Sequence, residues 1–338
     1  MKKHERTERA RGWSRRSFLA AAGAAALGAT PGRARAQARP VVRLQAFAGG
    51  STAIALKAIE EGGFDKVHGF EGKMFYFNPN ISYQQFIQRN TDISFDTDPL
   101  VVAKARLEGH KMVCFHSITN NHCAILVKKE APYRSLADLK GKRLGHYGID
   151  TGGFSSFALV ARARLGLDVM KEFQLREAAA PALLPLLGKG DLDAIVSFEP
   201  LMSKAAVTIG SRTLYGPFAH LWVEETGQPL LLTAMAAFED YVRTHRDLCR
   251  RVRDAWVDTA RWITANPGIV ERDSFKKLTG VTEPEAIPLL KRAIVEVPMY
   301  NDSWDGMREA TEKAIQRAAD LKVGIDRNPG GSTMRLDG

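Results

Sequence analysis

The sequence predicts an α/β fold with two lobes, each a mostly parallel sheet flanked by helices. Apolar strand-like runs alternate with stretches of helical periodicity from residue 41 to about 127, in the order β-α-β-α-β-α-β. A second β-α-β-α-β cycle begins near residue 135, and one more strand, at 230–237, precedes a mostly helical end. Strands that alternate with helices form parallel sheets, so two cycles predict two lobes. The late strand predicts a return of the chain to the first lobe.

The elements of the first cycle follow from hydrophobic periodicity and glycine stops. The run VVRLQAF at 41–47 reads as a strand, and Gly62-Gly63 ends the helix expected at 51–61. The remaining elements expected in this cycle are strands at 73–77, 92–95, 112–116 and 124–127 and helices at 83–88 and 99–109.

The second cycle and the C-terminal part are read in the same way. A short capped helix is expected at 135–139, from a serine followed three residues later by aspartate. The other expected elements are strands at 141–147, 173–177 and 194–197 and helices at 152–165, 181–189, 200–209, 241–265, 269–278, 284–293 and 302–321. We therefore predict a first lobe from 37–125 plus 228–325, a second lobe from 126–227, and a polar, flexible tail at 326–338.

The first 36 residues resemble a twin-arginine export signal. Ser14-Arg15-Arg16-Ser17-Phe18-Leu19 precedes a twelve-residue apolar stretch rich in alanine and glycine, and Ala34-Arg35-Ala36 follows it. The apolar stretch is shorter than the roughly 20 residues of a membrane span. The pattern predicts a cleaved signal, cut between Ala36 and Gln37 or after Ala38, and export of the folded chain to the periplasm by the twin-arginine machinery.

The export signal also explains the charge. Residues 1–36 hold nine Lys or Arg against two Glu, which is +7 of the formal net charge of +10. The mature chain is left near +3, so the basic composition gives no reason to expect a nucleic-acid partner. The three cysteines, an odd number without a pairing pattern, leave open one Cys114–Cys123 disulfide or three buried thiols.

Four short motifs, in this order along the chain, resemble one group of periplasmic solute-binding proteins. They are SLADLKGK at 135–142, GDLDA at 190–194, FEP at 198–200 and WITANP at 262–267. Their order and spacing are similar to those of the nitrate/sulfonate/taurine group, which also includes binders of pyrimidine precursors of thiamine. The resemblance covers about residues 40–322.

The resemblance implies the type II periplasmic binding protein fold, with a ligand cleft between the lobes. It implies a periplasmic, non-enzymatic and monomeric protein that captures a small solute by lobe closure and delivers it to an ABC transporter permease with its ATPase. No cofactor is implied.

Ligands of open α/β sheets bind beyond the carboxyl ends of the strands, and this rule selects the candidate site residues. The loop after the first strand has glycines that let backbone amides approach a ligand. The loop at 147–155 offers a tyrosine for stacking, hydroxyls and the amides of two glycines. Asp98 is expected to cap the helix that Pro99 begins, which leaves its neighbours as ligand candidates. The candidate ligand-binding residues are Phe47, Gly50, Ser51, Thr52, Asp96, Thr97, His116, Tyr147, Thr151, Gly152, Gly153, Phe154, Ser155 and Glu199.

The aromatic and acidic residues of these loops favour a planar, partly polar organic solute, such as a sulfonate, an aromatic acid or a pyrimidine. His116 and His122 lie six residues apart, but nothing near them completes a metal site, and none is expected. The alternatives are an enzyme on the same scaffold, either desulfinase-like or pyrimidine-synthase-like, and a periplasmic sensor partner. Desulfinases of this fold use a cysteine just after the first strand, where this chain has Gly49-Gly50-Ser51-Thr52.

Overall fold

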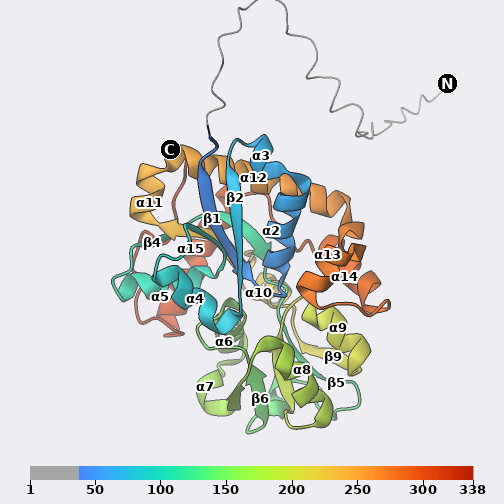
Figure 1. Cartoon of the computed structure of the whole chain (residues 1–338). Helices are drawn as coiled ribbons and strands as arrows, with labels where there is room; N and C mark the ends of the chain where they lie inside the picture. Colours follow the sequence, from blue (N-terminus) through green and yellow to red (C-terminus); the bar gives the residue numbers. More distant parts are fainter. Residues whose placement is uncertain (1–37, 338) are drawn as a thin grey trace, which may run out of the picture. The chain divides into compact units, whose positions relative to one another are not determined.

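The computed structural model describes residues 38–337, and the predicted export signal lies outside them. Two five-stranded mixed sheets, each flanked by helices, form the two lobes (Figure 1). This confirms the predicted two-lobed α/β fold. Within the described residues, no helix is long and apolar enough to cross a membrane.

The first sheet has the strand order β2-β1-β3-β10-β4, and only β10 runs against its neighbours. The predicted return strand is therefore inserted between two strands of the first cycle. Its eight residues are all buried, as expected for a strand covered on both faces. The strands of this sheet are β1 (Val41–Phe47), β2 (Glu71–Phe77), β3 (Ile93–Thr97), β4 (Met112–Asn120) and β10 (Leu231–Phe238).

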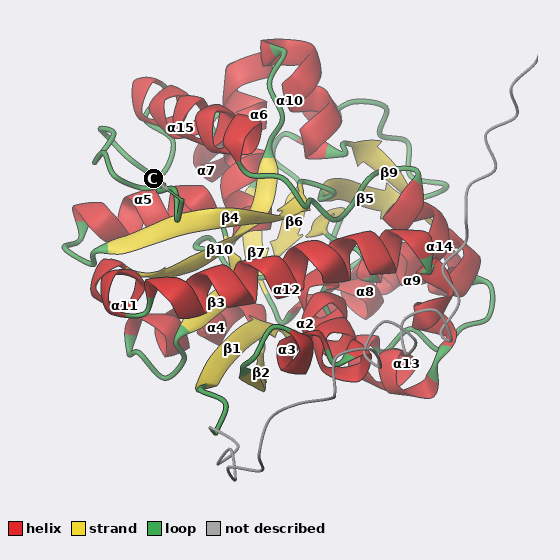
Figure 2. Cartoon of the chain, turned by 90° about the horizontal axis from the view of Figure 1, so that it is seen from above, coloured by secondary structure: helices red, strands yellow, loops and turns green. Residues whose placement is uncertain are grey.

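The helices of the first lobe come from both ends of the chain. Figure 2 shows the long helix α12 (Arg246–Ala265) running across this lobe. The ring of its Trp256 packs edge-on against Phe95, with centroids 5.9 Å apart. The other helices are α2 (Ser51–Gly62), α3 (Phe64–Val67), α4 (Pro79–Ile87), α5 (Pro99–Leu107), α11 (Glu239–Thr244), η2 (Pro267–Glu271), α13 (Asp273–Thr279), α14 (Ala286–Val295) and α15 (Asp305–Asp320).

The second sheet has the order β7-β6-β8-β5-β9. Its first strand in sequence, β5, begins at Ala124, so Ala124 and Ile125 belong to the second sheet and not to the first lobe as predicted. The strands are β5 (Ala124–Lys128), β6 (Arg143–His146), β7 (Gln174–Glu177), β8 (Ala194–Ser197) and β9 (Ser211–Tyr215). The helices are η1 (Leu136–Leu139), α6 (Gly152–Leu165), α7 (Val169–Glu172), α8 (Ala180–Lys189), α9 (Leu201–Thr208) and α10 (Phe218–Thr226).

Several elements differ from the sequence-based expectation. The edge strand β9 and the helix α10 were not predicted, because β9 is short and half-buried without a clear apolar alternation. The single helix expected at 241–265 is two helices that meet at His245. The helix expected at 269–278 is likewise divided, into η2 and α13.

The prediction of a flexible tail from residue 326 is wrong for the described part of it. Two backbone hydrogen bonds join this segment to β4. Cys114 N donates to Ser332 O, and Met334 N donates to Cys114 O, each at 2.9 Å. Leu336 is 2% exposed, and its carbonyl oxygen accepts from Arg246 Nε at 2.7 Å. Backbone pairing and a buried leucine hold the segment against the first lobe despite its polar composition.

The two lobes are joined where the chain crosses between the sheets. Asn121 N donates to Leu230 O at 2.9 Å, so the outgoing and returning segments are bonded to each other. Asn121 Nδ2 also donates to Ser156 Oγ on α6 at 2.6 Å. Asn121 is fully buried, and its side chain connects the crossover to the second lobe.

Candidate functional site

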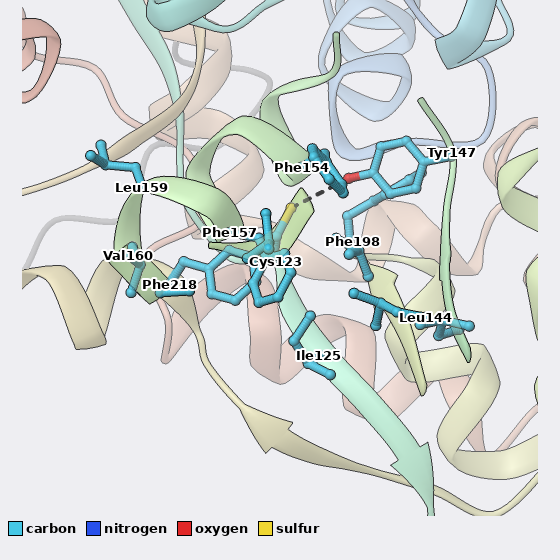
Figure 3. Close-up of a cluster of buried hydrophobic side chains, with 14 of the residues drawn as sticks. Cys123, Ile125, Leu144, Tyr147, Phe154, Phe157, Leu159, Val160, Phe198 and Phe218 are labelled. Carbon is cyan, nitrogen blue, oxygen red and sulfur yellow. Dashed lines mark hydrogen bonds between the residues drawn. The ribbon is translucent and has the colours of Figure 1, made fainter. Parts of the chain in front are cut away.

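The loops at the carboxyl ends of β1 and β3 face those of β6 and β8, as the strand-end rule predicts. Gly50, which precedes α2, lies against the ring of Phe198 from the second lobe: an added Cβ there would lie 3.6 Å from Phe198 Cε2. The rings of Phe198 and Tyr147 meet edge to face, with centroids 5.0 Å apart (Figure 3). A buried aromatic pair of the second lobe therefore covers the glycine loop of the first.

Asp98 marks a second contact between the lobes. Its Oδ1 accepts from Leu100 N at 2.5 Å, which confirms the predicted cap of α5. Its Oδ2 accepts from Ser156 Oγ of the second lobe at 3.4 Å. Burial raises the pKa of Asp98 to about 7. Nearby, an added Cβ on Gly152 would lie only 2.9 Å from Asp98 Oδ2 and from Leu232 O, so only glycine fits this approach of the lobes.

Glu199 is the corresponding carboxyl of the second lobe. It is 8% exposed, and burial raises its pKa to about 7. Its Oε2 accepts from Ser203 Oγ at 2.8 Å and from Ser203 N at 3.1 Å, so it caps its own helix, α9. The predicted ligand residue is present at the junction, with its carboxylate engaged in this local cap.

A pocket of about 330 Å³ opens beside these loops, between the lobes. The first lobe contributes the loop after β1 and the end of α13, and the second lobe contributes α8 and α9. Most of the lining is apolar. Lys204 is the charged residue of the lining. Its Nζ donates to Gly280 O at 2.5 Å and lies 3.4 Å from Glu283 Oε1. The lining residues are Ala48, Gly49, Ala180, Pro181, Leu184, Pro185, Leu201, Lys204, Thr208, Ile209, Thr279 and Gly280.

Two candidate residues of the first lobe, Asp96 and Thr97, serve its own packing. Asp96 is 4% exposed and is hydrogen-bonded by Gln45, Ser82 and Ser94, while Thr97 Oγ1 lies 2.6 Å from Ser94 Oγ. Burial raises the pKa of Asp96.

The helix α2 begins at Ser51 as expected, without a side-chain cap. Its N-cap is Gly50 and no side chain caps it, since Thr52 Oγ1 accepts from Phe47 N at 3.2 Å. Ser51 is 3% exposed, and its carbonyl oxygen accepts from Tyr300 at 2.9 Å. Neither Ser51 nor Thr52 therefore provides a side-chain cap for α2.

The loop before α6 is also packed internally. Thr151 Oγ1 donates to Gly148 O at 2.7 Å. An added Cβ on Gly153 would lie 1.7 Å from Tyr147 Oη, so the tyrosine hydroxyl covers the backbone there. Phe154 belongs to the hydrophobic core of the second lobe, and Ser155 lines a different pocket, described below.

His116 lies apart from these loops, in the middle of β4. Its ring packs 6.3 Å from that of Trp304, and neither ring nitrogen has a hydrogen-bond partner among residues 38–337. Burial, with Arg253 nearby, lowers its pKa to about 4, so the imidazole is neutral at pH 7. Among the described residues, no three His, Cys, Asp or Glu side chains gather as a metal site.

The three cysteines are buried free thiols, which decides between the two alternatives left open by the sequence. Cys123 Sγ lies 3.8 Å from Tyr147 Oη, and burial raises its pKa to about 12 (Figure 3). Burial likewise raises the pKa of Cys249 to about 12 and that of Cys114 well above its ordinary value. None of the three has the low pKa typical of a nucleophilic thiolate.

Solved structures with a similar fold include periplasmic binding proteins and a desulfurization enzyme. The alkanesulfonate-binding protein SsuA from Xanthomonas axonopodis pv. citri, bound to MOPS, superposes with a TM-score of 0.69 at 16% identity, over 89% of this chain and 100% of that one. The periplasmic aliphatic sulphonate-binding protein SsuA from Escherichia coli gives 0.64 at 17%, over 83% and 91%. The desulfurization enzyme DSZB gives 0.57 at 14%, over 87% and 95%.

No curated protein sequence matches this chain. The family model described as NMT1/THI5 like matches residues 74–269, which is more than half of the chain and includes strands of both sheets. This match and the sulfonate-binding fold neighbours confirm the resemblance read from the four sequence motifs. The chain belongs to the NMT1/THI5-like family.

Proposed function

We propose that this protein is the periplasmic solute-binding component of an ABC importer, exported by the twin-arginine route. The observation that carries the proposal is the meeting of strand ends from two α/β lobes around a pocket of about 330 Å³ to which both lobes contribute. Closure of two lobes over a ligand is the standard motion of such proteins. The fold neighbours named as sulfonate-binding proteins support the same function.

The solute that fits this pocket is a small organic molecule with a flat apolar part. The lining residues are mostly apolar, and the Tyr147 and Phe198 rings lie in the neighbouring loops, outside the lining. Lys204 supplies one positive charge, at present shared with Gly280 and Glu283 of the first lobe. We therefore propose an aromatic carboxylate or sulfonate, or a pyrimidine with an acidic substituent, as the solute.

A screen by thermal shift tests this function. Purified protein is melted with aromatic carboxylates, sulfonates, pyrimidines, amines and inorganic anions, since a ligand at concentration [L] stabilises by RT ln(1 + [L]/Kd). An aromatic or pyrimidine acid should raise the melting temperature. Stabilisation by inorganic anions alone contradicts the proposed solute class.

The substitution Gly50→Leu tests the place of binding. Gly50 has a φ of −96°, which any residue adopts, and an added Cβ would lie 3.3 Å from Phe47 Cβ and 3.6 Å from Phe198 Cε2, so a leucine there crowds both its own loop and the second lobe. We expect about tenfold or greater loss of solute affinity, from an overpacking cost of about 1–3 kcal/mol in the closed form. Gly306→Leu is the matched control, because nothing lies within 4 Å of an added Cβ there. Equal affinity in both variants places the solute elsewhere.

The desulfinase-like alternative has no support from the cysteines. All three thiols are buried, and the loop after β1 contains none. We propose that the protein is not an enzyme. Turnover of the bound solute by the purified protein would overturn this part of the proposal.

A further inference from the structure

A second pocket, of about 270 Å³, lies on another side of the junction between the lobes. Its walls are α5 of the first lobe, α6 and α7 of the second lobe, and the turn that follows α15. It shares no lining residue with the pocket beside the β1–α2 loop. Its lining residues are Leu100, Val101, Lys104, Ile149, Asp150, Phe154, Ser155, Ala158, Arg162, Leu167, Asp168, Val169, Met170, Lys322, Val323, Gly324 and Ile325.

The walls of this pocket are apolar. Leu100 and Val101 come from the first lobe, and Phe154 and Val169 come from the second. At the rim, Ile149 is 45% exposed and Met170 is 55% exposed, so the apolar lining continues to the surface. The volume lies just below the usual range for ligand sites, so the pocket suits a small apolar body.

Among the charged side chains at the rim, Lys322 is the cation without an ion-pair partner in residues 38–337. Lys104 Nζ lies 2.5 Å from Asp150 Oδ1, and Arg162 lies 3.4 Å from Asp168 Oδ2. Lys322 makes no ion pair or side-chain hydrogen bond with any other residue in the range 38–337. An occupant with a single negative charge would balance this lysine.

The backbone of Lys322 gives an independent reason to assign it a function. Its φ is +54°, and Arg89 is the other non-glycine residue with a positive φ between residues 38 and 337. Lys322 stands just after the end of α15, where Lys322 N donates to Ala319 O and Val323 N donates to Ala318 O. Glycine is the residue that favours this position. A strained lysine at a pocket rim is the kind of outlier that points to a binding function.

We propose that this pocket is a second small-molecule site, which takes an apolar body with one anionic group. Lys322 pairs with the anion, and side chains of both lobes enclose the apolar part. The site goes beyond the proposed solute-binding function, because it lies outside the loops that meet at Gly50 and Phe198.

Isothermal titration with two probes tests the site: 1-naphthoate and its uncharged analogue 1-naphthalenemethanol. Lys322→Gly should weaken 1-naphthoate binding about tenfold or more, since it removes a hydrogen bond to a charged group. It should leave 1-naphthalenemethanol binding unchanged. The same variant should melt at a higher temperature than the wild type, because glycine relieves the positive φ.

Two further variants control for a general effect of surface charge and for the location of the bound probe. Lys189→Glu changes an exposed lysine of the second lobe that lines neither pocket, and it should bind both probes as the wild type does. Ala158→Phe should fill the second pocket and abolish binding of both probes at that site. Wild-type binding of 1-naphthoate by Lys322→Gly, or of both probes by Ala158→Phe, overturns the proposal.

The cleft variant Gly50→Leu separates this site from the proposed solute site. It should bind both probes normally, since Gly50 does not line the second pocket. Loss of 1-naphthoate binding in Gly50→Leu, with binding kept in Ala158→Phe, places the probe between the β1–α2 and β8–α9 loops. That result overturns the second site and leaves the proposed function intact.

Discussion

The two lobes contain the same loop design, and they use it differently. In each lobe a buried strand ends, and a carboxylic acid followed by proline leads into the next helix. Asp98-Pro99 follows β3, with Pro99 the first residue of α5, and Glu199-Pro200 follows β8, with Pro200 the N-cap of α9. Burial raises the pKa of both acids to about 7. Asp98 accepts from Ser156 across the lobes, whereas the hydrogen bonds that the Glu199 carboxyl accepts within residues 38–337 come from Ser203 of the helix that follows it.

This difference in hydrogen-bond partners indicates that Glu199 contributes to the stability of its own lobe, whereas Asp98 also contributes to the contact between the lobes. A carboxyl that caps only its own helix contributes to the folding of its lobe. A carboxyl bonded across the junction also contributes to the closed arrangement, and a solute that binds between the lobes must be sensitive to it. Substitutions at Asp98 should therefore change solute binding, and equivalent substitutions at Glu199 should not.

The largest expected effect is on the pH dependence of stability. Each acid has a folded pKa near 7 and an unfolded pKa near 4, so the folded state binds more protons between these values. The contribution of each of these two carboxyls to stability is then greatest below pH 4 and falls as the pH rises to about 7, by at most about 4 kcal/mol.

Asp98→Asn and Glu199→Gln should each flatten this profile and make the protein more stable at pH 8 than the wild type. Urea unfolding between pH 4 and 8 measures it. If the difference in stability between each variant and the wild type does not grow from pH 4 to pH 8, the burial of that acid is contradicted. Solute affinity should change in Asp98→Asn alone.

The second-largest expected effect is steric crowding at Gly152, where the two lobes meet. Gly152→Ala places a methyl group 2.9 Å from the Leu232 carbonyl oxygen and from the Asp98 side chain, so the lobes must separate. We expect a cost of about 1–3 kcal/mol in the closed form and a matching loss of solute affinity by calorimetry. Gly268→Ala, where nothing lies within 4 Å, is the control. Unchanged affinity in Gly152→Ala would show that closure does not need this contact.

A smaller effect is expected at Ser156, which links the crossover to Asp98. Ser156 Oγ accepts from Asn121 and donates to Asp98, so Ser156→Ala leaves two buried groups with one partner fewer. The expected cost is about 1–3 kcal/mol of unfolding free energy, measured in urea. Ser203→Ala is the counterpart on Glu199. If both serine variants weaken solute binding equally, the proposed distinction between the two loops fails.

The smallest effect is expected at the rim. Lys204 of α9 reaches Glu283 and Gly280 of the first lobe, and its side chain is 28% exposed. Partly exposed ion pairs contribute about 0–1 kcal/mol, so Lys204→Met should barely change the melting temperature. It should weaken an anionic solute more than a neutral analogue in parallel titrations. Equal weakening of both would remove Lys204 as the partner of the anionic group.

Local sequence signals predicted the lobes and the cap at Asp98. The β-α-β order and the Asp98-Pro99 pair depend on neighbouring residues, and the structure confirms both. Phe198, Ser156 and Lys204 were not selected, because their roles arise only when distant loops meet.

The same limit explains candidates that serve packing. Asp96 follows a strand as a ligand residue would, but Gln45, Ser82 and Ser94 from three elements take up its oxygens. The amide-rich turn at Gly153 suggested an anion site, and the hydroxyl of Tyr147 covers it. Only tertiary contacts decide whether a strand-end polar group is free for a ligand.

The central claim, closure of the lobes over a solute, is tested most directly by a distance between them. Spin labels at Lys189→Cys on the second lobe and Lys277→Cys on the first react selectively, because the native cysteines are buried. Double electron–electron resonance then measures the distance between the two spin labels, first without the solute and then with the solute identified by thermal shift. The account predicts a shift to one shorter distance at saturation, and no shift in Gly50→Leu. A distance distribution unchanged by a saturating, stabilising solute would contradict it.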